Sequence, residues 1–95
     1  MTFLATDDAP LRDAKLVFSS LPHGASKEWV DRAREAGAKV VDLSSDLRIG
    51  HGANGIPYGL TEANRKAIGS ADLVANPGCY PTAILLRLLP LLERK

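Results

Sequence analysis

The sequence has little cysteine and almost no net charge. Cys79 is the single cysteine among 95 residues, so no disulfide forms within the chain and a reducing, cytoplasmic location is expected. One cysteine and two scattered histidines make no zinc-binding pattern, so we expect no metal site. Basic residues number 12 against 11 acidic residues, a balance that gives no charged surface for nucleic acid or a membrane. A small molecule is therefore the expected partner.

Long hydrophobic runs are also missing. The longest apolar stretch, residues 83–92, is interrupted by Arg87 and Pro90 and is too short to span a bilayer. The start of the chain lacks the basic and then apolar order of a signal peptide. With 95 residues the chain has room for one small domain with a limited core, and we expect it to be part of a larger protein.

Strand-like and helix-like segments alternate along the chain. Residues 15–20 and 38–45 are apolar runs that end in small polar residues, a pattern typical of buried strands. Between them, residues 26–36 carry apolar side chains at helical spacing, with Trp29 expected in the core and Gly37 as the C-cap. A strand, a helix and a strand with short joints favour a right-handed parallel crossover.

The same alternation continues toward the carboxyl end. Residues 46–60 contain four glycines and a proline and predict an irregular loop, followed by a short helix over 61–68 and a strand over 71–76. From Thr82 onward the sequence is apolar almost all round, which predicts a helix buried on most sides and kinked or ended near Pro90.

Together these segments predict an α/β fold. We expect a partial Rossmann-like open parallel sheet of about three strands with flanking helices, the second half of a dinucleotide-binding domain. No glycine-rich phosphate turn joins a strand to a helix, because "GHGANG" at 50–55 follows a loop instead. The first half of such a domain is therefore expected to be absent from residues 1–95.

Cys79 lies between the third predicted strand and the last helix, in "VANPGCYPTA". The turn at 76–78 precedes it and Pro81 suits the first helical position, so the sulfur falls at or just before a helix N-terminus. There the unpaired N–H groups and the helix dipole favour a thiolate and could hold an oxyanion on an attacked carbonyl. These residues alone leave a small buried structural thiol as an equal alternative.

The residues at fixed distances from Cys79 in the sequence exclude two kinds of cysteine chemistry. A phosphatase loop needs an arginine six residues later, where Leu85 stands, and a dithiol motif needs a cysteine at 76 or 82, where Asn76 and Thr82 stand. Acyl transfer or aldehyde chemistry through a thioester is what this spacing leaves.

Four stretches resemble one enzyme family in order and spacing. "ANPGCYPTA" at 75–83 resembles the active-site signature of the N-acetyl-gamma-glutamyl-phosphate reductases, which are related to aspartate-semialdehyde dehydrogenases, and "SLPHG" at 20–24, "VVDLSSDLR" at 40–48 and "YGLTE" at 58–62 agree with it. The resemblance implies an enzyme of arginine biosynthesis in which the Cys79 thiolate attacks an acyl phosphate and expels phosphate. NADPH then reduces the thioester to N-acetyl-glutamate semialdehyde.

The resemblance also implies which residues form the rest of the site. Pro22, His23 and Gly24 would lie against the ribose and nicotinamide of NADPH, as would Asn76 and Gly78, which alternatively only shape the turn. His23 is expected to be structural or a cofactor contact, because the family's catalytic histidine comes from a later domain.

Three residues after the second strand are expected to bind the substrate, namely Ser44, Ser45 and Arg48. Arg48 could hold a carboxylate or phosphate through its planar guanidinium, or instead form a structural ion pair with Asp42 or Asp46.

The chain departs from the family pattern in three places. Leu47 stands where an aromatic residue is usual, Arg87 stands where a small residue is usual, and the loop between Arg48 and Tyr58 is short. By resemblance, residues 1–95 are the middle of a homo-oligomeric enzyme, without the glycine-rich half and the later catalytic and dimerisation domain, and should not turn over alone. The alternatives are a reductase of aspartyl or aminoadipyl phosphate, or a truncated binding or assembly module.

Overall fold

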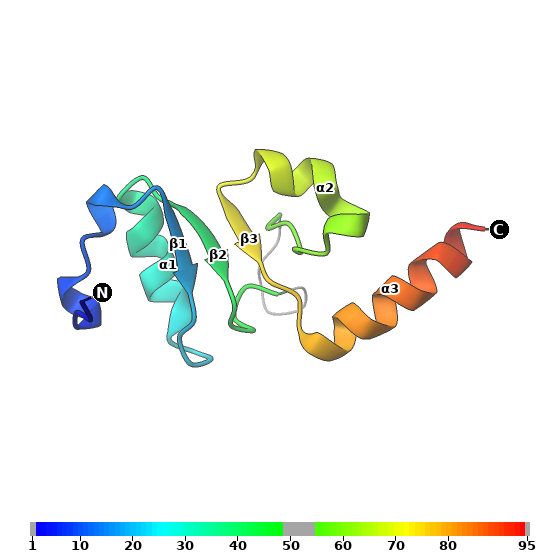
Figure 1. Ribbon diagram of the computed structural model, residues 1–95, viewed down its shortest axis with the longest axis horizontal. Coiled ribbons are helices and arrows are strands. Elements are labelled where there is room, and N and C mark those ends of the chain that lie inside the picture. Colours follow the sequence, from blue (N-terminus) through cyan, green and yellow to red (C-terminus); the bar gives the residue numbers. More distant parts are fainter. Residues whose placement is uncertain (1, 49–54, 95) are drawn as a thin grey trace.

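The computed structural model describes residues 2–48 and 55–94 (Figure 1). Two 3-10 turns, Thr6–Asp8 and Leu11–Asp13, precede an alternating series of strands and helices. In chain order the series is β1 (Leu16–Ser19), α1 (Ser26–Glu35), β2 (Lys39–Asp42), α2 (Thr61–Ser70), β3 (Leu73–Ala75) and α3 (Cys79–Glu93). The predicted alternation of strands and helices is confirmed.

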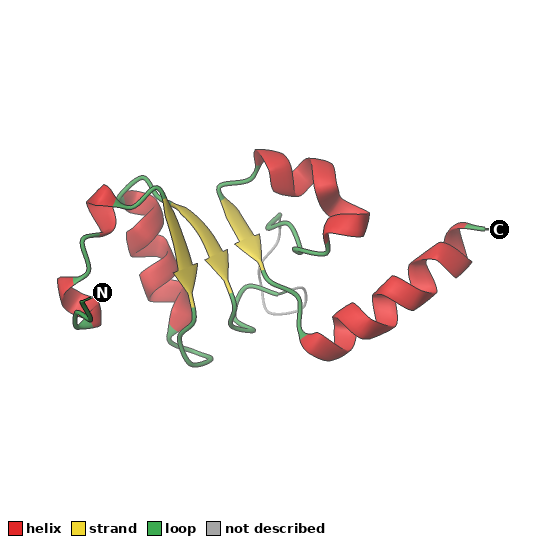
Figure 2. Cartoon of the chain, in the orientation of Figure 1, coloured by secondary structure: helices red, strands yellow, loops and turns green. Residues whose placement is uncertain are grey.

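The three strands form one parallel sheet in the order β1-β2-β3. Val17 pairs with Val40, and Val40 in turn pairs with Leu73. Because all strands run the same way, their carboxyl ends lie at one edge of the sheet, as Figure 2 shows. The predicted open parallel sheet of about three strands is confirmed.

The core lies between α1 and one face of this sheet. Val30 and Ala33 of α1 pack with Val40 of β2, and Leu73 and Ala75 of β3 complete the buried cluster. Leu47, from the loop after β2, also packs into this cluster, so the aliphatic side chain at this position is part of the core. Trp29 is only half buried, contrary to the prediction of a core residue, and the guanidinium of Arg32 lies over its ring at 3.9 Å from the centroid.

A short segment before α2 runs alongside β3. Tyr58 forms a parallel bridge with Ala75, the Gly59 N–H donates to the Ala75 carbonyl at 2.8 Å, and the Ala75 N–H donates to Pro57 at 3.1 Å. A Cβ on Gly59 would lie 3.0 Å from Cγ1 of Val74, so glycine permits this close approach.

The last helix differs from its prediction. α3 begins at Cys79 and continues through Pro90 to Glu93, with Pro81 in its first turn, and none of its residues is buried. Figure 1 shows it leading away from the sheet. The expectation of burial on most sides is wrong for this chain, because no described element packs over the apolar side chains Ile84, Leu88 and Leu91.

The remaining differences concern element ends. α2 passes through Gly69 to Ser70, with non-helical angles at Asn64, and β2 and β3 are shorter than predicted. The glycine-rich stretch around His51 and the shortened part of its loop lie outside the described residues. No helix in the described ranges is long and apolar enough to cross a membrane.

Candidate active site

Three loops leave the carboxyl edge of the sheet next to one another. The loop after β1 carries Pro22, His23 and Gly24, and the loop after β2 carries Ser44, Ser45 and Arg48. The turn after β3 carries Asn76 and Gly78 and leads into Cys79. Hydrogen bonds join the first loop to the second, and the second loop to the turn. The structure therefore brings the predicted site residues to one edge of the sheet, where open α/β folds bind ligands.

Cys79 is exposed and is the first residue of the 15-residue helix α3. Gly78 is the N-cap, and its carbonyl accepts hydrogen bonds from the Thr82 N–H at 3.0 Å and the Thr82 hydroxyl at 2.7 Å. The sulfur is therefore accessible beside the first N–H groups of a helix, where a negative charge is favoured. Of the two alternatives for this cysteine, burial as a structural thiol is wrong.

Arg48 connects the loop after β2 to the turn before Cys79. Its Nε donates to the Asn76 carbonyl and one terminal nitrogen donates to the Leu43 carbonyl, both at 2.9 Å. In the described part of the chain neither Asp42 nor Asp46 forms an ion pair with Arg48, so that alternative is wrong. The guanidinium instead binds backbone at the ends of β2 and β3.

His23 is bonded to the second loop. The Ser45 N–H donates to its Nδ1 at 3.0 Å, and the Ser45 hydroxyl lies 3.0 Å from the same nitrogen. Nδ1 therefore acts as an acceptor, which places the proton of the neutral ring on Nε2. This contact gives His23 a structural role and leaves Nε2 as a donor for a ligand.

Asp46 caps the N-terminal end of α1. Its carboxylate accepts hydrogen bonds from the Gly24 N–H at 2.8 and 2.9 Å and from the Ser26 N–H at 3.1 Å. The Gly24 bond is the main cause of a pKa for Asp46 below its ordinary value of 3.8; desolvation opposes this shift, and the Ser26 bond acts in the same direction as the Gly24 bond. This internal anion occupies donors that a ligand phosphate would otherwise use.

A buried polar cluster lies beneath these loops. Asp42 has no exposed surface and accepts hydrogen bonds from the hydroxyls of Ser26 and Ser44, the second at 2.7 Å. The Ser19 and Ser26 hydroxyls are 2.6 Å apart, which links the end of β1 to the start of α1. Ser44 is itself buried, so its hydroxyl supports the loop from inside rather than from the surface.

Sequence reasoning gave no site role to Asp42, Asp46, Ser26 or Tyr58. Tyr58 receives a hydrogen bond from the Gly78 N–H at 3.3 Å, so it also holds the turn before Cys79. An aspartate directly at the end of an apolar strand, and a tyrosine in a glycine-rich loop, were the available signals. Neither signal identifies the partner, which comes from another element.

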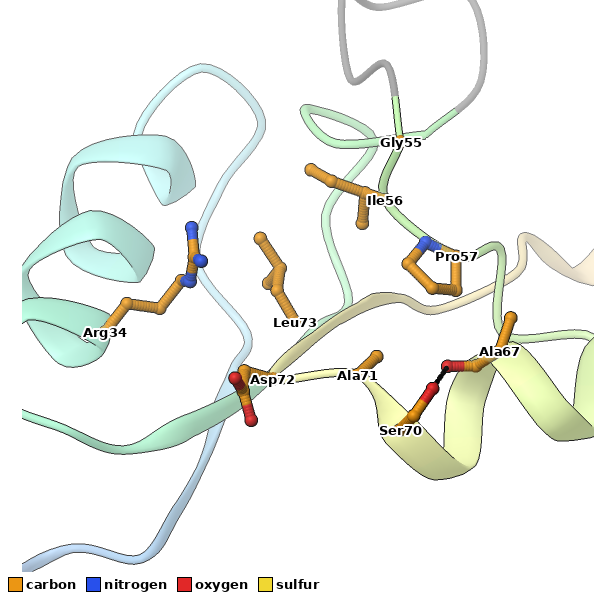
Figure 3. Close-up of a pocket in the computed structure, with 9 residues that line it drawn as sticks. All are labelled: Arg34, Gly55, Ile56, Pro57, Ala67, Ser70, Ala71, Asp72 and Leu73. Atoms are coloured by element: carbon orange, nitrogen blue, oxygen red, sulfur yellow. Dashed lines mark hydrogen bonds between the residues drawn. The ribbon is translucent and has the colours of Figure 1, made fainter.

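A pocket also lies at the opposite edge of the sheet. The pocket in Figure 3, about 380 Å³ in volume, is lined by Arg34, Asp72 and Leu73 among others and lies at the amino end of β3, away from Cys79. Among residues 2–48 and 55–94, no group of three or more metal-ligating side chains comes together.

The fold and the carboxyl-edge site define a nucleotide-binding α/β domain, and sequence comparison gives its class. Residues 1–71 match the family described as semialdehyde dehydrogenase, NAD binding domain. The chain therefore belongs to the semialdehyde dehydrogenase family.

Particular relatives are similar over nearly all of the chain. The N-acetyl-gamma-glutamyl-phosphate reductase of Bordetella avium is 39% identical over 112 aligned positions, which cover 100% of this chain and 32% of the relative. The reductases of the same name from Neisseria gonorrhoeae and Moorella thermoacetica are 40% and 44% identical, covering 99% and 93% of this chain and 32% and 30% of the relatives. The chain thus spans about a third of the length of these curated relatives.

Solved structures give the same class. Aspartate semialdehyde dehydrogenase II from Vibrio cholerae superposes with a TM-score of 0.79 at 26% identity, covering 93% of this chain and 26% of that protein. The same enzyme complexed with ASA gives a TM-score of 0.78 at 27% identity, covering 92% and 28%.

A nicotinamide dinucleotide, the ligand of this domain family, fits part of the edge described here. Gly24 has a φ of +88°, and no atom lies within 4 Å of where a Cβ would stand, so the backbone is open to a flat ligand. The N–H groups of Gly24 and Ser26, in contrast, are occupied by Asp46. These two N–H groups are therefore not available to a phosphate of the cofactor.

Proposed function

We propose that this chain is the cysteine-bearing part of an NADPH-dependent N-acetyl-gamma-glutamyl-phosphate reductase, an enzyme of arginine biosynthesis. The observation that carries the proposal is the exposed Cys79 at the start of α3, within a sequence similar throughout to enzymes of that name. A cytoplasmic location and homo-oligomerisation of the whole enzyme stay predictions.

In the proposed reaction the Cys79 sulfur attacks the acyl carbon of the substrate. A carbon–sulfur bond forms, the bond from that carbon to the phosphate oxygen breaks, and phosphate leaves with its electron pair. The N–H groups of the first turn of α3 stabilise the oxyanion that forms on the carbonyl. NADPH, which Pro22, His23 and Gly24 would hold, would supply the hydride that converts the resulting thioester into the semialdehyde and the free Cys79 thiolate.

The remaining residues serve this step by binding and orienting. We propose that Pro22, His23 and Gly24 contact the cofactor, with the Nε2 proton of His23 as a donor. Asn76 and Gly78 fix the turn before the nucleophile and border the same cofactor. We propose that Ser45 contacts the substrate, whereas Ser44 supports the loop through its hydrogen bond to Asp42.

The first test uses the 95-residue chain with freshly prepared N-acetyl-gamma-glutamyl phosphate. We expect one equivalent of phosphate to be released and a thioester adduct on Cys79 in the mass spectrum, but no continuing turnover with NADPH. Cys79→Ser is the matched control and should release no phosphate. Continuing NADPH oxidation by the chain alone would contradict the prediction that it is incomplete.

The second test places residues 1–95 into the Bordetella avium reductase in exchange for the matched segment. We expect the chimaera to oxidise NADPH with N-acetyl-gamma-glutamyl phosphate and not with aspartyl phosphate. Preference for aspartyl phosphate would support a reductase of another acyl phosphate. A folded chimaera that neither turns over nor becomes acylated would support a non-catalytic module and refute the proposal.

A further inference from the structure

The turn before Cys79 is fastened by groups that lie far away in the sequence. The Asn76 N–H donates to the Asp42 carbonyl at 2.8 Å, while the Asn76 carbonyl accepts from Arg48 Nε at 2.9 Å. The Gly78 N–H donates to the Tyr58 hydroxyl oxygen at 3.3 Å. Two side chains, Arg48 and Tyr58, therefore hold the backbone that leads directly to the sulfur.

Arg48 is the more extensively bonded of the two. Its hydrogen bonds to the carbonyls of Leu43 and Asn76 connect the ends of two neighbouring strands. Only a planar guanidinium offers several donors in a fixed fork, whereas a lysine at this position has one nitrogen on a flexible stem. The geometry therefore depends on arginine and not on a positive charge alone.

Gly78 provides a second, independent observation. Its φ of −72° and ψ of 160° suit any residue, so backbone conformation does not require glycine here. A Cβ at this position would lie 3.0 Å from Arg48 Nη1 and 3.3 Å from Cδ of Pro81. The absence of a side chain thus permits the guanidinium to lie against the turn.

We propose that Arg48 is a positioning residue that sets the direction of the Cys79 sulfur by bracing the Asn76–Gly78 turn, with Gly78 kept small to receive it. This inference rests on the proposed function, because it gives Arg48 a role in the reactivity of the nucleophile. The expectation that this guanidinium also binds a substrate anion stays a prediction beside the positioning role. Two of its nitrogens are already committed to backbone carbonyls.

The two roles differ in an experiment without substrate. We would measure the rate at which iodoacetamide, an uncharged reagent, alkylates Cys79 in the 95-residue chain as a function of pH. A positioning role predicts that Arg48→Ala slows alkylation at pH 7 by about tenfold, because an unbraced Asn76–Gly78 turn lets the first turn of α3 fray, and the sulfur then loses its fixed place beside the first N–H groups. A substrate-binding role predicts an unchanged rate and an unchanged pH profile.

Further variants separate positioning from charge and from unfolding. Arg48→Lys should lose most of the effect despite keeping the charge, whereas Arg87→Lys on the exposed side of α3 should behave as the unaltered chain. Gly78→Ala keeps the arginine but should also slow alkylation. Combining Gly78→Ala with Arg48→Ala should slow alkylation little further, because both substitutions disturb the same contact between Arg48 and Gly78. Circular dichroism of each variant reports whether the sheet is intact.

The outcomes test the inference separately from the proposed function. Alkylation of folded Arg48→Ala and Gly78→Ala chains within twofold of the unaltered rate would overturn the positioning role. Because iodoacetamide needs neither acyl phosphate nor NADPH, a failure of the chimaera to turn over leaves this measurement intact. In an active chimaera, Arg48→Lys is expected to lower kcat more than it raises KM, and the reverse split would contradict positioning.

Discussion

Asp42 shows how much the carboxyl edge depends on one side chain. Its carboxyl group is fully buried and accepts hydrogen bonds from Ser26 and Ser44, while its own carbonyl accepts from Asn76. Removing a shared acceptor leaves buried hydroxyls without a partner, which costs more than the bond itself contributes. The residue therefore stabilises both the loop after β2 and the turn before Cys79.

We expect Asp42→Ala to lower the free energy of unfolding by about 2–4 kcal/mol in urea titrations, because two buried hydroxyls lose their acceptor. The matched control is Asp31→Ala, whose carboxylate pairs with Lys27 on the surface of α1. That variant should change stability by no more than about 0.5 kcal/mol. Equal effects of the two substitutions would show that the buried hydrogen bonds of Asp42 stabilise the chain no more than a surface ion pair does.

Two glycines give a second prediction at this scale. Gly59→Ala places a Cβ 3.0 Å from Val74 and 3.2 Å from the Ala75 carbonyl, and should destabilise the chain by about 1–3 kcal/mol. Gly69→Ala in α2 meets no atom within 4 Å and should stabilise it by about 0.5–1 kcal/mol. Thermal unfolding followed by circular dichroism measures both, and a stabilising Gly59→Ala would contradict the close packing against β3.

Residue-level prediction from sequence succeeded where the signal is local. Cys79 was placed at the start of a helix because a strand, a turn and a proline surround it, and this is confirmed. The partners of Arg48, Asp42 and Asp46 were missed or misassigned because each lies on a different element. Spacing along one chain contains no information on which backbone carbonyl a side chain reaches across the sheet.

At the scale of elements, Asp46 joins the loop after β2 to the N-terminus of α1. Hydrogen bonds from Gly24 and Ser26 lower its pKa in the folded chain, so the unfolded chain binds more protons in acid. The stabilisation is therefore fully present above the ordinary pKa of 3.8 and is lost as the pH falls through the lower folded value. The carboxylate form is the one that caps the helix.

It follows that Asp46→Ala should be less stable than the unaltered chain at pH 7, with a difference that shrinks as the pH falls below the ordinary pKa of 3.8 and through the lower folded value. Urea titrations at several pH values measure this convergence. Asp8→Ala, which removes an exposed carboxylate from the first 3-10 turn, is the matched control. A difference for Asp46→Ala that persists in acid would mean that the carboxylate charge is not what stabilises the cap.

Element prediction was correct for type and order because hydrophobic periodicity differs between strands and helices. α1 matched its prediction within a residue, since its periodic apolar face and Gly37 mark both length and end. α3 was expected to be buried because its sequence is apolar all round. Periodicity measures the tendency of a helix to be covered, and it cannot say whether the covering element belongs to the same chain.

At the scale of the whole molecule, the described residues form a compact part and an extended part. The principal extents are 51 × 29 × 25 Å, and α3 leads away from the sheet with the carboxyl end of the chain (Figure 1). Its exposed apolar side chains include Leu91 and Leu92, 65% and 58% accessible. Cys79 therefore lies at the junction between a packed sheet and an uncovered helix, and the turn before it is hydrogen-bonded to Arg48 and Tyr58.

This division predicts that backbone amides are protected from hydrogen exchange to different degrees along the chain. α3 is longer than α1, but it buries no residue, whereas α1 buries Val30 and Ala33 against the sheet. Isolated helices of about 15 residues are marginal in water, so tertiary packing and not length should control amide exchange. We expect amides of residues 84–93 to exchange at least about tenfold faster than those of α1 in hydrogen–deuterium exchange mass spectrometry.

Matched truncations identify the cause of that difference. Val30→Ala removes a fully buried side chain and should speed exchange throughout α1, whereas Leu88→Ala, where the side chain is 46% accessible, should leave exchange in α3 nearly unchanged. In the chimaera with the Bordetella avium reductase, slower exchange of residues 84–93 would show that the other two-thirds of that protein cover this helix. If the amides of α3 exchanged as slowly as those of β2 in the chain alone, the exposed arrangement of α3 would be contradicted. Cys79 would then begin a helix that is rigid without contacts from another part of a larger protein.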